Sequence, residues 1–407
     1  MSRRIPFSAA ILIALTAAAI SLAEDTRVVI SVEKPKANLV EAGKPPFTGQ
    51  RPAVDVAILL DTSNSMDGLI GQAKNQLWTI VQQFAKAKKN GQTPVLRVAL
   101  FEYGNTRLPA AEGYIRQVVP LTDDLDKLSE SLFALTTSGG DEYCGQVIDE
   151  ALTRLDWSKE PNGYKAIFIA GNEPFTQGSV DYQKACKRAI EKGVVVNTIH
   201  CGARQEGIEG GWRNGAQLAE GEFFNIDQDR AVVQIDCPQD KIIIKLSAEL
   251  NTTYLWCGTA QDRGRFAANQ AAQDANAEGA GAGTASSRGV AKASAAYSNR
   301  NRDLVDTLAE DGDILRKLKE QELPEALQQL NAGDREAYVR RMAARRSDIQ
   351  KQINALAAER EEFLAKEGKR LAGASGDSTF GDAAVLAIRK QLTKSGFENT
   401  EEARQGK

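Results

Sequence analysis

The sequence predicts an α/β fold in which helices cover both faces of a doubly wound, mostly parallel central sheet. Short apolar runs alternate with helical patterns between residues 54 and 257, and this alternation is typical of parallel strands joined by helices. The run at 166–170 is apolar throughout, as expected of a central strand buried on both faces. Beyond residue 299 the apolar residues follow helical spacing, which predicts a helical, partly coiled-coil C-terminal region.

The elements of the α/β region follow from the period of the apolar residues, which is close to two in strands and 3.6 in helices. The expected strands are 54–60, 95–103, 114–119 (an antiparallel edge strand), 166–170, 194–199 and 223–226. The expected helices are 69–84, 125–135, 147–152, 182–192, 215–219 and 240–250.

The N-terminus reads as a secretory signal over residues 1–23. Arg3 and Arg4 precede the apolar stretch 11–22, and small residues follow at 21–23. An uncleaved membrane anchor is the alternative. After cleavage we expect no other membrane span, so the protein would be secreted or periplasmic. The polar segment 24–53 is expected to be a lead-in to the first domain.

Charge and composition narrow the function classes. The net charge of −3 favours neither nucleic acid nor an anionic membrane as partner. His200 is the single histidine, and we expect it to be a hydrogen-bonded core residue. Without a second histidine or a nucleophile–base pair, we expect no enzyme activity. The cysteines are Cys144, Cys186, Cys201, Cys237 and Cys257. A Cys237–Cys257 bridge and buried free thiols are both open.

The end of the first strand carries the chemistry that we single out. The apolar run 54–60 stops at Asp61, Ser63 and Ser65, and a helical pattern begins at about Asp67. A strand that ends in this way places three oxygen ligands at the carboxyl edge of the sheet, where ligands bind in open α/β folds. Oxygen donors of this kind suit Mg²⁺ or Mn²⁺. The alternative is that these side chains only cap the following helix.

Two further loops are expected at the same edge of the sheet. One contains Asp141, with Glu142 and Thr137 nearby, and the other contains Asn172 after the strand 166–170. We therefore predict one divalent cation held by Asp61, Ser63, Ser65, Asp141 and Asn172.

These residues resemble the metal-ion-dependent adhesion site of the von Willebrand factor type A (VWA) domain. The Asp-x-Ser-x-Ser motif at 61–65 has the expected strand-to-helix setting, and the resemblance covers 54–257. The stretches 56–78 and 139–152 look like a bacterial secreted branch. Asp141 stands where the family has threonine and Asn172 where it has aspartate. A bound Asp141 would weaken the hold on a partner's acidic group.

The resemblance implies a protein partner whose acidic side chain completes the shell of the cation, with 240–250 as the closing helix of the domain. The alternative is a metal-independent structural or scaffold protein of the cell envelope that assembles through its helical tail.

The C-terminal half is predicted from composition and helical spacing. The Ala/Gly-rich segment 258–298 reads as a flexible linker or a poorly packed helix. In the helical region 299–407, apolar residues recur at three- and four-residue spacing at Val339, Met342, Ile349, Ile353, Leu356 and Phe363, with Arg346 and Arg360 at inner positions. This spacing predicts either a short coiled coil that could join copies of the chain or a helix packed on its neighbour at 315–330.

Overall fold

The computed structural model describes residues 51–160, 163–227, 229, 235–371 and 380–399. The predicted signal sequence and almost all of the predicted lead-in lie outside these residues. No helix in the described ranges is long and apolar enough to cross a membrane.

The centre of the fold is a six-stranded sheet with the strand order β4-β3-β1-β5-β6-β7. All neighbouring strands are parallel except β3 and β4, which are antiparallel. The strands are β1 (Ala53–Asp61), β3 (Val95–Tyr103), β4 (Ile115–Thr122), β5 (Tyr164–Gly171), β6 (Val195–Cys201) and β7 (Phe223–Ile226). A separate two-stranded sheet pairs β2 (Ala87–Lys88) with β8 (Glu398–Asn399). The predicted fold class and the antiparallel edge strand are confirmed.

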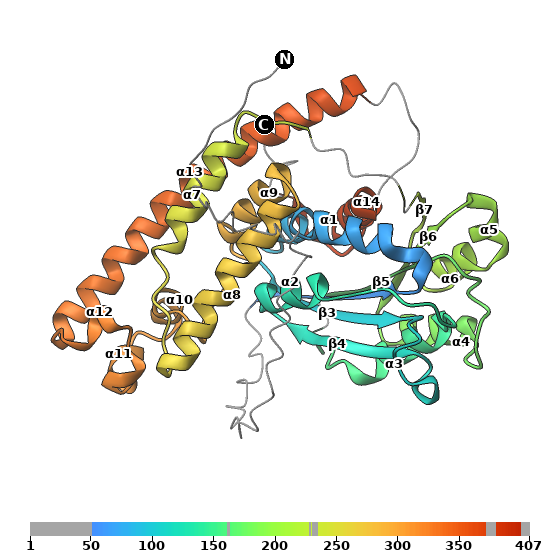
Figure 1. The fold of residues 1–407 in the computed structure, drawn as a ribbon, viewed down its shortest axis with the longest axis horizontal. Helices are drawn as coiled ribbons and strands as arrows, with labels where there is room; N and C mark the ends of the chain where they lie inside the picture. The colour runs from blue at the N-terminus through green and yellow to red at the C-terminus, as the bar shows by residue number, and fades with distance from the viewer. Residues whose placement is uncertain (1–50, 161–162, 228, 230–234, 372–379, 400–407) are drawn as a thin grey trace, which may run out of the picture. The chain divides into compact units, whose positions relative to one another are not determined.

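Helices cover both faces of this sheet (Figure 1). Alternate residues of β1 enter different cores, because successive side chains of a strand point to opposite faces. One face packs against α1 (Asp67–Ala85), α2 (Leu125–Phe133) and α14 (Phe380–Lys394), whereas α7 (Asp240–Asn251) packs on α9 (Ala282–Lys292) and α13 (Ala332–Leu371). The other packs against α3 (Cys144–Arg154), α4 (Tyr182–Glu191) and α6 (Trp212–Leu218), and α5 (Arg204–Glu209) contacts α6.

The C-terminal half continues as helices joined by short connections. They are α8 (Ala260–Gly279), α9 (Ala282–Lys292), α10 (Leu304–Glu310), α11 (Ile314–Lys317), α12 (Glu325–Gln328), α13 (Ala332–Leu371) and α14 (Phe380–Lys394). Single 3-10 turns are η1 (Asn64–Met66), η2 (Ala110–Glu112) and η3 (Glu320–Glu322). The helix α14 lies within the region 299–407 that we predicted to be helical, and it packs against α1 over the sheet (Figure 1).

The Ala/Gly-rich segment differs from our prediction of a linker or a poorly packed helix. It forms α8 and α9, and α9 is buried against α1 and α7. A Cβ atom on Gly289 would lie 3.1 Å from side-chain atoms of Ile243 and Ser247 on α7. The small residues therefore allow close helix packing here, a role that composition alone does not distinguish from flexibility.

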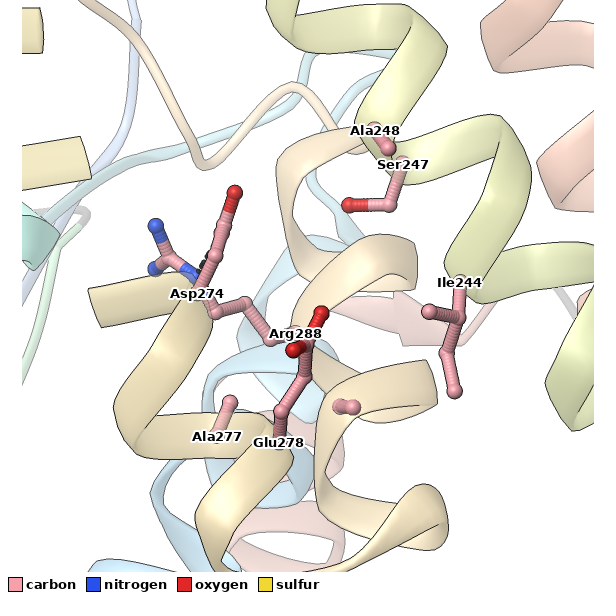
Figure 2. Close-up of a pocket in the computed structure, with 8 residues that line it drawn as sticks. Ile244, Ser247, Ala248, Asp274, Ala277, Glu278 and Arg288 are labelled. Carbon is pink, nitrogen blue, oxygen red and sulfur yellow. Dashed lines mark hydrogen bonds and ion pairs between the residues drawn. The ribbon is translucent and has the colours of Figure 1, made fainter. Parts of the chain in front are cut away.

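A buried group of charged side chains joins α9 to its neighbours. Arg288 Nη1 lies 2.8 Å from Asp126 Oδ1 on α2, and the Arg288 guanidinium also pairs with Asp274 on α8. Lys292 Nζ lies 3.0 Å from Asp274 Oδ2 and donates to Ser247 Oγ on α7 at 3.0 Å. Figure 2 shows Ser247, Asp274 and Arg288 around the small pocket between α7, α8 and α9. We call Asp126, Asp274, Arg288 and Lys292 the ion cluster.

The apolar seam of α13 packs within its own chain. Val339 and Met342 contact the cluster formed by Leu323, Leu327 and Leu330, which confirms the predicted packing on 315–330. Farther along, Ile349 and Ile353 enter the core that includes residues of α7. The two inner arginines are ion-paired in the same chain. Arg346 pairs with Asp303 and Asp306, and Arg360 pairs with Asp240. Association of copies through this seam remains a prediction.

The five cysteines are buried free thiols in the structure. Cys237 and Cys257 are therefore not bridged, which agrees with the alternative that we left open.

Candidate functional site

The site begins at the carboxyl end of β1, the strand that lies between β3 and β5. Asp61 is fully buried there. Its Oδ1 accepts a hydrogen bond from the Ser63 backbone N–H at 2.7 Å, whereas its Oδ2 has no partner among the described residues. The hydroxyls of Ser63 and Ser65 lie 3.1 Å apart. Neither serine side chain caps η1 or α1, so the structure does not support the capping alternative.

Backbone hydrogen bonds fix the loop before α3 onto the loops after β1 and β3. Ser138 N donates to Thr62 O at 2.9 Å, and Thr106 N donates to Gly139 O at 2.9 Å. Gly104, which follows β3, has a φ of +78°, and a Cβ there would lie 2.8 Å from both Asp61 Oδ1 and Glu142 Cγ. Only glycine fits this position, because the backbone is left-handed and the space is filled by the two acidic side chains.

The placement of the acidic pair 141–142 differs from our prediction. Glu142 is buried, and its side chain borders the same space beside Gly104 as the Asp61 carboxyl group, with which it interacts electrostatically. Asp141 is exposed, and its Oδ2 accepts a hydrogen bond from the Tyr143 hydroxyl at 3.2 Å. Neighbouring residues of an extended segment point in opposite directions, so only one of the two acids can face Asp61. Spacing in the sequence carries no signal for which of them does.

Asn172 follows β5 and reaches the same site. Its backbone N–H approaches the Asp61 carboxylate, and its side-chain Oδ1 is buried without a partner among the described residues. The Asn172 carbonyl oxygen lies 3.2 Å from His200 Nε2, and His200 Nδ1 lies 2.9 Å from Asn225 Oδ1. His200 is therefore buried and hydrogen-bonded, as expected, and it holds the loop that carries Asn172.

The electrostatics of the site are set by two carboxyl groups that face each other in a buried place. Burial raises the pKa of Asp61 to about 6. Burial, followed by the nearby charge of Asp61, raises the pKa of Glu142 to about 9. No lysine, arginine or histidine contributes to either shift among the described residues. The pair must therefore hold a proton or a cation from solution near neutral pH.

The donor set fits a hard divalent cation. Three buried oxygens lack a partner in the described part of the chain, namely Asp61 Oδ2, Glu142 Oε2 and Asn172 Oδ1. The Ser63 hydroxyl acts to lower the pKa of both carboxyl groups, against the effect of burial. Two carboxylates balance the charge of a divalent ion, and oxygen-only donors suit Mg²⁺ or Mn²⁺ better than Zn²⁺. Within the described ranges no three His, Cys, Asp or Glu side chains form a metal-binding group, so any cation here would depend on hydroxyl, amide and water oxygens.

A protein-family model matches the α/β region. Residues 55–217 match the family model of the von Willebrand factor type A domain. The chain contains a VWA domain. No curated protein sequence matches it.

Several solved structures are similar to the VWA domain of this chain. The conserved hypothetical protein BatB from Bacteroides thetaiotaomicron is 20% identical, with a TM-score of 0.33, and the match covers 43% of this chain and 91% of that one. Proximal thread matrix protein 1 from the mussel byssus, with a zinc-occupied MIDAS motif, is 17% identical over 44% of this chain and 43% of that one, with a TM-score of 0.34. The vWF domain of the type V pili tip protein Mfa5 from Porphyromonas gingivalis is 12% identical, with a TM-score of 0.32, and the match covers 44% of this chain and 91% of that one.

Proposed function

We propose that this protein is exported and binds a protein partner through a divalent cation held at the carboxyl end of β1. The observation that carries the proposal is the buried pair Asp61 and Glu142, which faces no cationic side chain among the described residues. A bound Mg²⁺ or Mn²⁺ would neutralise the pair and take up the unpartnered oxygens beside it.

The binding mode follows from the coordination chemistry. Mg²⁺ demands six oxygen ligands and retains waters where the protein supplies fewer. A partner's aspartate or glutamate would displace one of these waters and complete the shell. Because Asp61 and Glu142 already neutralise the ion, we expect the partner's carboxylate to be held weakly and to exchange readily. The chemistry is recognition, and we assign the site no catalytic role.

The cell-envelope scaffold is the second candidate function. It needs the helical tail to contact other copies, yet the seam of α13 packs on α7, α10 and α11 of the same chain. We therefore favour binding at the cation site.

The test is a calorimetric titration of Mg²⁺ and Mn²⁺ into the metal-free full chain. We expect saturable binding that is lost in Asp61→Ala and in Glu142→Gln. The matched control is Asp141→Asn, one residue away and exposed, which should bind the cation like the unchanged chain. Circular dichroism and thermal unfolding of each variant check that it is folded.

A pull-down with and without chelator then tests the partner. Capture that requires Mg²⁺ and fails with Asp61→Ala supports the proposal. If Mg²⁺ at millimolar concentration gives neither heat nor a shift in unfolding temperature, the proposal is wrong and the scaffold function takes its place.

A further inference from the structure

A cleft of about 450 Å³, lined by charged and aromatic side chains, lies at the opposite edge of the sheet from the cation site. Its position follows from the direction of β4. Thr122, at the end of β4, pairs with Val98 near the start of β3, whereas Ile115 pairs with Tyr103 at the end of β3. Asp124, the N-cap of α2, therefore lies near the amino ends of the parallel strands. The volume of the cleft falls within the range of small-molecule sites.

One wall of the cleft is aromatic and held rigidly. Trp256 stacks on Tyr254 with ring centres 5.2 Å apart and an interplanar angle of 9°, and it meets Phe266 of α8 at 5.9 Å. Phe266 also lies under two guanidinium groups, those of Arg265 at 5.1 Å and Arg302 at 5.4 Å. Both aromatic rings line the cleft and are only half-buried, so they offer a fixed apolar surface to a ligand.

The other wall is charged, but its charges are already neutralised within the protein. Asp124 pairs with Arg302 at 2.5 Å, and Asp126 pairs with Arg288 at 2.8 Å. Lys127 pairs with Glu130 at 3.1 Å. A charged ligand would therefore meet no unpaired opposite charge on this wall. The paired carboxylates and guanidinium groups still have hydrogen-bonding capacity, which suits a ligand rich in hydroxyl groups.

A buried amide on the cleft points independently to a ligand. Asn299 lines the cleft and is 3% exposed, and its side-chain Nδ2 has no hydrogen-bond partner among the described residues. Its backbone is fully engaged, since its N–H donates to Asp306 Oδ2 and its carbonyl accepts from the N–H groups of Arg302 and Asp303. A donor left unsatisfied in a buried place is rare in proteins, and a ligand oxygen would satisfy it.

We propose that this cleft binds a neutral saccharide. A pyranose ring presents C–H groups on one face, which would lie on Trp256 and Phe266, and hydroxyls at its rim, which would bond to Asp124, Arg302 and Asn299. The site does not involve the cation, because it lies at the other edge of the sheet, so the two proposals succeed or fail separately.

The test is ligand-observed NMR and calorimetry on the full chain with a panel of neutral mono- and disaccharides that covers gluco, galacto, manno and N-acetylated rings. We expect saturable binding of at least one neutral sugar, unchanged by chelator. Phe266→Ala and the near-isosteric Asn299→Leu should each weaken binding about tenfold or more, which corresponds to 1.4 kcal/mol. Leu386→Ala, an exposed change on α14, is the control and should leave the affinity unchanged.

Thermal unfolding and circular dichroism of each variant show whether the fold is retained. Three results would overturn the proposal. They are no binding by any sugar of the panel at millimolar concentration, equal binding by Phe266→Ala and Asn299→Leu, or tighter binding of glucuronic acid or glucosamine than of the neutral sugars.

Discussion

Two groups of buried carboxylates in this chain have opposite surroundings. In the ion cluster, Asp126 and Asp274 face Arg288 and Lys292. At the cation site, Asp61 and Glu142 face each other. Burial acts to raise the pKa of Asp274, but Arg288 and Lys292 reverse this and hold it below its usual value. No cationic side chain does the same for Asp61 or Glu142 among the described residues, and the pKa values of both are raised.

The difference shows which carboxylates serve stability and which are available for binding. A buried carboxylate needs an opposite charge. The ion cluster supplies that charge from the chain itself, where it joins α2, α8 and α9. At the cation site the opposite charge has to come from an ion or a proton in solution. The carboxylates of the two places are alike in being buried acidic side chains. What distinguishes them is whether a cationic side chain lies beside them.

The largest expected effect on stability comes from removing Arg288, one of the two cations of the ion cluster. Arg288→Ala leaves Asp126 without a cationic partner and Asp274 with Lys292 alone, and breaking a buried pair costs about 3–5 kcal/mol. Denaturant unfolding measures this loss. Arg316→Ala is the control because Arg316 pairs with Asp313 at the surface, where a pair contributes about 0–1 kcal/mol. A loss of under about 1 kcal/mol in Arg288→Ala would contradict the comparison.

A substitution at the cation site should have a smaller effect and should increase the free energy of unfolding. In chelator at pH 8, Glu142→Gln removes a group whose pKa is raised to about 9 by burial and by Asp61. The free energy of unfolding should rise by about 1 kcal/mol or more, because the unfolded chain no longer gains from ionising this side chain. With Mg²⁺ at the same pH, we expect the unchanged chain to be more stable than Glu142→Gln, because only the unchanged chain binds the ion. A variant less stable than the unchanged chain in chelator would count against the carboxyl pair.

The smallest effect is a pH dependence of the stabilisation by Mg²⁺. The usual pKa values of the two groups are 3.8 and 4.5, and in the folded chain they are raised to about 6 and about 9. The folded chain therefore holds protons that the unfolded chain has released, so the contribution of the pair to stability falls as the pH rises through this window. Mg²⁺ replaces these protons, and the gain in unfolding temperature from Mg²⁺ should grow between pH 5 and pH 8. The pair would not be the binding site if this gain were independent of pH.

Much of the fold could be predicted because its signals are local. The apolar runs at 54–60 and 166–170 indicate strands whatever they pair with, and the Asp-x-Ser-x-Ser motif marks the strand end where a ligand binds. The prediction for the Ala/Gly-rich segment was wrong, because a flexible linker and a tightly packed helix such as α9 can both be rich in small residues. The seam of α13 shows the same limit, since spacing reveals an apolar face but not the surface that covers it.

The amino-acid sequence by itself determined the order of the main strands and helices in the α/β region, the edge of the sheet where the site lies and the oxygen chemistry of Asp61, Ser63 and Ser65. Only the tertiary structure decided that Glu142 and not Asp141 turns toward Asp61, and that Arg288 and Lys292 neutralise one set of carboxylates but not the other. The reason is that a strand or helix follows from contacts between near neighbours, whereas the direction of a loop side chain depends on backbone contacts such as Ser138 with Thr62. Those contacts join residues that the sequence keeps far apart.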